Sequence, residues 1–128
     1  MLDPGEPSLY QRLGGHDVIS AFVDDIMARV TTDPTLAVYW KGKSLDSRRK
    51  DSQLLLEFLC MSFGGPSAYL GRDMKTSHAG LGITDDEWDV FGVHAVAALD
   101  KLGISGREKS EFLAAATSLK EDIVEVPR

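Results

Sequence analysis

The sequence predicts an all-α protein, and three observations carry this prediction. Apolar residues recur at three- and four-residue steps through most of the chain, as they do on the buried face of a helix. Two segments begin with a capping box, in which a Ser or Thr is followed three residues later by a Glu. No segment shows the clean polar–apolar alternation that is typical of a half-buried strand.

The first third of the chain predicts two helices and an aromatic corner. A short helix is expected near Tyr10 and a long one over residues 17–31. One face of the long helix is apolar and consists of Ile19, Phe22, Val23, Ile26, Met27 and Val30. Asp33-Pro34 should end this helix, because a residue that precedes proline disfavours helical backbone. The sequence LAVYWKGKS follows as a corner that contains Tyr39 and Trp40.

The middle of the chain predicts a second long helix over residues 46–63 and a short helix that ends at His78. The apolar set of the long helix is Leu54, Leu55, Phe58, Leu59 and Phe63, and Gly64-Gly65-Pro66 should stop it. The sequence SAYLG after it reads as a turn or a short helix. Asp73 can cap the short helix that carries His78. The glycine-rich segment between these points is only partly helical, and segments of this kind are often functional.

The last part predicts two helices with clear starts. Thr84 and Glu87 form the first capping box, and the helix after it has an apolar stripe of Trp88, Phe91, Ala95, Ala98, Leu99 and Leu102. Ser105 and Glu108 form the second box, before a helix with Phe112, Leu113, Ala116, Leu119 and Ile123. We expect one domain over residues 1–128, with frayed tails at 1–7 and 125–128.

Composition narrows the class of protein. The 128 residues suit a single domain, and the net charge of −6 argues against a nucleic-acid surface or an anionic membrane as partner. No apolar stretch approaches the ~20 residues of a membrane span, and the first residues do not resemble a signal peptide. Cys60 is the single cysteine and should pack as a small hydrophobe. These features predict a cytoplasmic protein.

His78 has two interpretations on the residues alone. It can be a surface histidine, favoured at the C-terminus of a helix by the helix dipole. It can instead be a metal or haem ligand, with Met74 on the same helical face. The absence of further ligands nearby argues against zinc, whereas haem iron needs only one side chain from this part of the protein. His16 is expected at a surface corner, and His94 as a partly buried packing or hydrogen-bonding residue.

Three stretches of the sequence resemble the group I truncated haemoglobins. They are SLYQRLGGHD, FGGPSAYLGRDMKTSHAGLGIT and ITDDEWDVFGVHAVAALDKLGI, in the order and spacing of that family apart from a short insertion near residues 43–49. The resemblance is firm over residues 8 to 104. It implies a globin-like two-over-two helical sandwich, haem b as the cofactor, and His78 as the proximal ligand of the haem iron.

The resemblance also implies a haem pocket, in which the residues expected to face a bound gas differ from the family pattern. Met27 stands at the position of the usual tyrosine, Leu55 at that of the usual glutamine, and Trp40 at that of the usual phenylalanine. Lys50 is expected to pair with the haem propionates, the alternative being a solvated run of charges. The remaining pocket residues are expected to be Asp51, Leu54, Phe58, Leu59, Phe63, Tyr69, Met74, Ile83, Trp88 and Phe91.

These residues predict a haem-b globin that reversibly binds diatomic gases (O2, CO or NO) at ferrous iron. The alternative is a nitric-oxide dioxygenase or peroxidase-like enzyme; because no flavin or nicotinamide motif is present, it would need an external reductase. Met27 packs in a dry pocket in the main interpretation, but as a second axial ligand it would make the protein an electron carrier. A helical domain that has lost haem is a further alternative, against which the intact segment around His78 argues.

Overall fold

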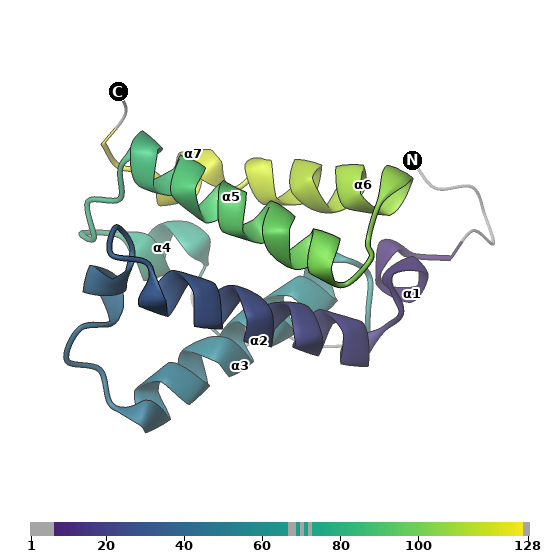
Figure 1. Cartoon of the computed structure of the whole chain (residues 1–128), viewed down its shortest axis with the longest axis horizontal. Helices are drawn as coiled ribbons and strands as arrows, with labels where there is room; N and C mark the ends of the chain where they lie inside the picture. Colours follow the sequence, from purple (N-terminus) through teal and green to yellow (C-terminus); the bar gives the residue numbers. More distant parts are fainter. Residues whose placement is uncertain (1–6, 67–68, 70, 72, 127–128) are drawn as a thin grey trace.

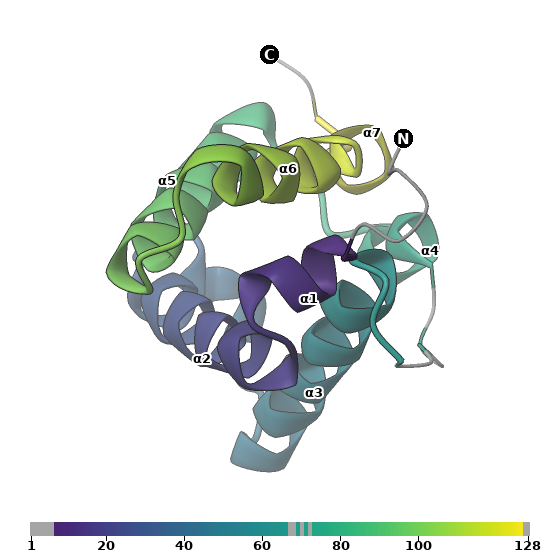
Figure 2. The same cartoon turned by 90° about the vertical axis from the view of Figure 1, so that its right-hand side faces the viewer.

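The computed structural model describes residues 7–66, 69, 71 and 73–126, and its helices lie in two layers (Figure 1). In chain order the elements are α1 (Leu9–Leu13), α2 (His16–Thr32), the 3-10 helix η1 (Ala37–Trp40), α3 (Leu45–Ser62), α4 (Met74–His78), α5 (Asp85–Lys101), α6 (Gly106–Thr117) and α7 (Lys120–Ile123). Helices α2 and α3 form one layer and α5 and α6 the other, while α1 lies at one end (Figure 2). The predicted two-over-two helical fold is confirmed.

The core lies between the two layers. Its deeply buried side chains from the apolar faces predicted for α2, α5 and α6 include Ile19, Phe22, Ile26, Val30, Ala98, Leu99 and Phe112. On α3 the buried residues are Leu56, Leu59 and Cys60, of which only Leu59 belongs to the predicted face. The Phe112 ring meets Phe22 at a centroid distance of 4.7 Å and Phe63 at 4.9 Å. Cys60 is 2% exposed, which confirms that it packs as a small apolar residue.

Sharp turns at glycine separate the first helices. Gly14 has a φ of 116°, a backbone conformation that side chains other than hydrogen rarely permit, and it ends α1. The turn brings α1 against the end of α3, where the backbone N–H of Tyr10 donates a hydrogen bond to the Phe63 carbonyl oxygen over 2.8 Å. The left-handed backbone at Gly14 is therefore part of what places α1 against α3.

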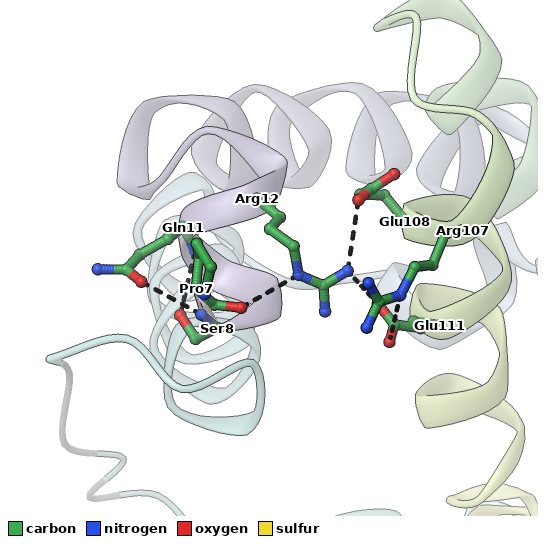
Figure 3. A network of polar contacts seen from close by, with 7 residues as sticks. All are labelled: Pro7, Ser8, Gln11, Arg12, Arg107, Glu108 and Glu111. Atoms are coloured by element: carbon green, nitrogen blue, oxygen red, sulfur yellow. Dashed lines mark hydrogen bonds and ion pairs between the residues drawn. The ribbon is translucent and has the colours of Figure 1, made fainter. Parts of the chain in front are cut away.

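A network of ion pairs joins α1 to α6 (Figure 3). The Arg12 guanidinium reaches the carboxylates of Glu108 at 3.3 Å and Glu111 at 2.5 Å, and its Nε donates to the Pro7 carbonyl oxygen. This network explains why the predicted capping box at Ser105 is wrong. The Ser105 side chain makes no capping hydrogen bond, and Glu108 pairs with Arg12 instead.

The predicted last helix is divided in two by the structure. α6 ends at Thr117, and α7 begins three residues later. At the break the Thr117 and Ser118 hydroxyls donate to the carbonyl oxygens of Leu113 and Ala115, bonds that are typical of residues that weaken or bend helices. Periodicity alone did not reveal this interruption.

The expectation of a frayed C-terminal tail is wrong for Glu125 and Val126. Their backbone N–H groups both donate to the Ile83 carbonyl oxygen, over 2.9 and 3.1 Å, and Val126 forms an isolated bridge with Thr84. At the other end, Pro7 takes part in the Arg12 network. Residues 1–6 and 127–128 lie outside the described part of the chain, as do three residues of the SAYLG segment.

Two side-chain bonds attach α5 to the layer below it. His94 Nε2 lies 2.7 Å from an Asp33 carboxylate oxygen, with both side chains 20% exposed. This confirms the prediction for His94, and the pair lowers the pKa of Asp33 below its ordinary value. Near the start of α5 the Tyr39 hydroxyl donates to Glu87 over 2.7 Å, and the Thr84–Glu87 capping box forms as predicted. His16 is exposed, also as predicted.

Candidate functional site

The candidate site is centred on His78, the last residue of α4. Asp73 caps this five-residue helix by accepting a hydrogen bond from the Thr76 N–H over 2.8 Å, as the sequence predicted. His78 Nδ1 lies 2.9 Å from the Met74 carbonyl oxygen and 2.9 Å from the Ser77 hydroxyl. Because a carbonyl oxygen can only accept, Nδ1 carries the proton. In the neutral ring Nε2 then keeps its lone pair for another partner.

The loop after His78 is bound by the end of the chain. Gly80 and Gly82 have φ values of 82° and 68°, and their N–H groups donate to the two carboxylate oxygens of Glu125 over 3.1 and 2.9 Å. These bonds lower the pKa of Glu125 below its ordinary value, and the bond from Gly82 has the larger effect. We call Glu125 and Val126, with their hydrogen-bond partners in residues 80–85, the C-terminal clasp.

Large apolar side chains that were assigned to the pocket remain only partly buried. Trp88 and Phe91 of α5 stack at 6.2 Å, and Phe58 of α3 meets the Tyr69 ring edge-to-face at 5.2 Å. The other half-buried members come from α2, η1, α3, α4 and the loop before α5: Met27, Trp40, Leu54, Leu55, Met74 and Ile83. Apolar area that the protein itself leaves uncovered is what a large flat cofactor can bury.

Four of the predicted site residues have other surroundings. Leu59 and Phe63 are buried in the core, where the Phe63 ring packs against α6. Lys50 is exposed on α3, and its role stays a prediction. The Asp51 carboxylate pairs with Lys43 at 2.6 Å, which occupies one of its oxygens.

The α3 helix exposes Gln53 and partly buries Leu55. The exposed Gln53 amide donates to Glu57 over 3.2 Å, while Leu55 packs partly buried against the core. A groove of about 340 Å³ runs between α2 and α3, and Met27, Val23 and Leu56 contribute to its wall. Met27 therefore shares this groove with apolar side chains and with polar and charged ones, among them Gln53, Arg48 and Arg49.

Sequence reasoning missed the Tyr39–Glu87 bond and the clasp. Glu87 was identified only as a capping residue, yet its Oε1 accepts from both Tyr39 and the Thr84 N–H. Burial and this bond raise the pKa of Tyr39 to about 12. For Glu125, no local pattern identifies its partners, because they lie more than forty residues away in the sequence.

Comparisons with known proteins agree with this geometry. The sequence model of the family "Bacterial-like globin" matches residues 8–125. The chain is 34% identical to the "Group 1 truncated hemoglobin GlbN" of Mycolicibacterium paratuberculosis over 116 residues, which cover 91% of this chain and 83% of that protein. The chain belongs to the group 1 truncated haemoglobins. Its helical fold is that of the truncated haemoglobin of Tetrahymena pyriformis in the Fe(III) form, with a TM-score of 0.84, 23% identity and coverage of 92% and 98% of the two chains.

Truncated haemoglobins are a haem-binding family, and the candidate site of this member is compatible with a haem. The 2/2 hemoglobin of a Synechococcus species, with covalently attached heme, superposes with a TM-score of 0.81 at 24% identity, over 92% of this chain and 98% of that one. In the part of the chain that the structure describes, no cluster of three or more His, Cys, Asp or Glu side chains could hold a metal ion. A porphyrin supplies four nitrogens itself, so a single imidazole such as that of His78 would suffice. None of the described helices is long and apolar enough to cross a membrane.

Proposed function

We propose that this truncated haemoglobin holds haem b through His78 and reversibly binds a diatomic gas. The observation that carries the proposal is the orientation of the His78 ring. Nδ1 donates to the Met74 carbonyl oxygen, which leaves Nε2 as the coordinating nitrogen and fixes the plane of the imidazole. Ferrous haem iron supplies the reversible site for O2, CO or NO. The protein supplies the proximal nitrogen and a largely apolar surround.

The apolar surround favours gas binding over the enzymatic alternatives. Of the three residues Met27, Leu55 and Trp40 at the family's gas-facing positions, Met27 and Leu55 cannot donate hydrogen bonds, and Trp40 can do so through its indole N–H. A nitric-oxide dioxygenase or peroxidase-like enzyme with an external reductase would depend on a long-lived oxygen complex. The absence of donors at Met27 and Leu55 favours rapid release of a polar gas instead, because each missing hydrogen bond removes about 0.5–1.5 kcal/mol.

Replacement of the proposed ligand tests the assignment. We expect His78→Ala to lose stable five-coordinate haem binding, because the described part of α4 and its loop offers no other imidazole or thiol. The measurement is the absorption spectrum of ferric, ferrous and CO-treated protein together with haem retention on a desalting column. His16→Ala is the matched control, since His16 is exposed on α2. A wild-type Soret band in His78→Ala would show that another residue holds the iron.

The residue opposite His78 is tested by Met27→Tyr, which restores a hydrogen-bond donor. Oxygen dissociation should become slower by about tenfold, the factor that corresponds to 1.4 kcal/mol. Met27→Leu keeps the apolar character and should change the rate little. A sulfur-to-iron band in the ferric spectrum that disappears in Met27→Leu would establish Met27 as a ligand and favour electron transfer. An unchanged rate in Met27→Tyr would place residue 27 away from the bound gas.

A further inference from the structure

We propose that the C-terminal clasp positions His78, with Glu125 as the positioning residue. The inference rests on the proposed role of His78 as the haem ligand and goes beyond it, because it assigns a role to the far end of the chain. In Figure 1 the last described residues lie beside the start of α5, and α7 lies next to α4. The end of the chain is thus close to the proposed ligand although 47 positions separate Glu125 from His78.

The α4 helix cannot fix its own position. It has five residues, and isolated helices shorter than about 12–15 residues are marginal in water. The residue after His78 already has extended backbone, and Gly80 and Gly82 follow in left-handed conformations that leave this connection flexible when it is unbound. The Met74 carbonyl oxygen orients the ring within α4, but the position of α4 itself therefore depends on contacts made from outside it.

Glu125 supplies contacts of this kind to the loop that follows α4. One carboxylate oxygen accepts from the Gly80 N–H and the other from the Gly82 N–H, so a single side chain holds two amides of the loop at once. Hydrogen bonds to an ionised acceptor are roughly twice as strong as neutral ones. The positive φ values of the two glycines turn both N–H groups toward the same carboxylate.

The backbone of the tail fixes the other end of the same loop. Two N–H groups of the tail donate to the Ile83 carbonyl oxygen, and the Asp85 N–H donates to the Val126 carbonyl oxygen over 3.2 Å. The Lys120 ammonium of α7 adds an ion pair of 3.0 Å with the Asp85 carboxylate at the start of α5. Residues 80–85 are therefore held along their length, and His78 stands immediately before them.

This arrangement predicts that the clasp influences both the strength of the iron–histidine bond and the orientation of His78 toward the iron. If Glu125 is removed, Gly80 and Gly82 lose their common acceptor, and α4 gains freedom to tilt. The iron–histidine bond should then weaken, and haem should leave the protein faster.

The test compares Glu125→Ala, Glu125→Gln and the control Glu121→Ala in the haem-loaded protein. Glu121 is an exposed carboxylate on α7 outside the clasp, so its removal controls for charge. Three quantities are measured: hydrogen–deuterium exchange of the peptide that contains residues 79–84, the iron–histidine stretching band of the ferrous form, and the rate of haem transfer to an acceptor globin. In Glu125→Ala we expect about tenfold faster amide exchange, a shifted band and faster haem transfer.

Glu125→Gln retains a carbonyl oxygen that can accept from one glycine, so it should give intermediate values, while Glu121→Ala should match the wild type. Unchanged exchange in Glu125→Ala would show that the clasp does not hold the loop. Faster exchange with an unchanged stretching band would show that the clasp stabilises the loop without positioning His78; either result overturns the inference. If instead His78→Ala keeps normal haem, the proposed ligand is wrong, and the exchange data alone still report on the clasp.

Discussion

At the end of the molecule where α1 meets α6, ion pairs between side chains join the elements, whereas at the end that carries His78 backbone groups make most of the bonds. The Arg12 guanidinium joins two carboxylates of α6 (Figure 3). In the clasp, the Glu125 carboxylate and the backbone of Val126 bind a loop through its amide and carbonyl groups.

The difference matters because the two kinds of contact constrain the chain differently. Ion pairs between long side chains tolerate small shifts of the helices and weaken in salt. Bonds to the backbone fix the path of the chain itself. His78 directly precedes the bound loop, and it needs a fixed backbone if it is to bind a metal in one orientation. The first end contributes to stability, and the second should determine geometry.

The largest expected effect on stability comes from the core beside the α1–α6 end. Phe112→Ala should lower the free energy of unfolding by about 3–5 kcal/mol, because it removes a buried ring that contacts two other phenylalanines. Urea unfolding of the protein measures this loss. Phe91→Ala, which truncates a partly buried ring on α5, is the matched variant and should cost less. Equal losses would contradict the difference in burial between Phe112, which is in the core, and Phe91, which is only packed against it.

A smaller effect is expected from the ion pairs themselves. Arg12→Met should lower the melting temperature by a few degrees at low salt, and the difference from the wild type should shrink near 1 M salt, where charges are screened. Arg107→Met is the control, because Arg107 also approaches Glu111 but is more than half exposed. The haem-transfer rate should not change in Arg12→Met. A change as large as that of Glu125→Ala would remove the distinction between the two ends.

The smallest effect should come from Tyr39, whose hydroxyl joins η1 to the start of α5. Tyr39→Phe should cost about 1 kcal/mol near pH 8, the value of one hydrogen bond, and salt should not alter it. The pKa of Tyr39 is raised to about 12 from 10, so the neutral phenol is the form that stabilises the fold. Its contribution is complete below about pH 10 and is lost as the pH rises toward 12.

Urea unfolding of wild type and Tyr39→Phe at several pH values measures this dependence. The difference in stability between them should decline through that alkaline range. A difference that stays constant up to pH 12 would show that folding does not raise the pKa of Tyr39.

The sequence predicted those features that depend on neighbouring residues. The Thr84–Glu87 cap, the Asp73 cap and the apolar faces of α2 and α5 all form between residues a few positions apart. Where a distant partner competes, local reasoning fails. Glu108 has the spacing of a capping residue but pairs with Arg12, 96 positions earlier.

The same distinction applies to the candidate site. His78 was identified from its segment, and the Met74 carbonyl oxygen that orients it is only four residues away. The partners of Glu125 could not be predicted, because no periodic pattern in the sequence relates the C-terminal residues to the loop between α4 and α5. Tyr39 and Glu87 are 48 positions apart, and their bond became visible only in the folded chain.

The buried thiol of Cys60 allows the opening rate of the folded protein to be measured by chemical labelling. A thiol reacts as the thiolate, and burial raises the pKa of Cys60 as well as excluding reagents. Because the sequence contains no other cysteine, each modification event reports one exposure of the contact between α3 and the core. With a reagent in excess, the labelling rate becomes the rate at which the folded state opens, read without denaturant and at a single atom.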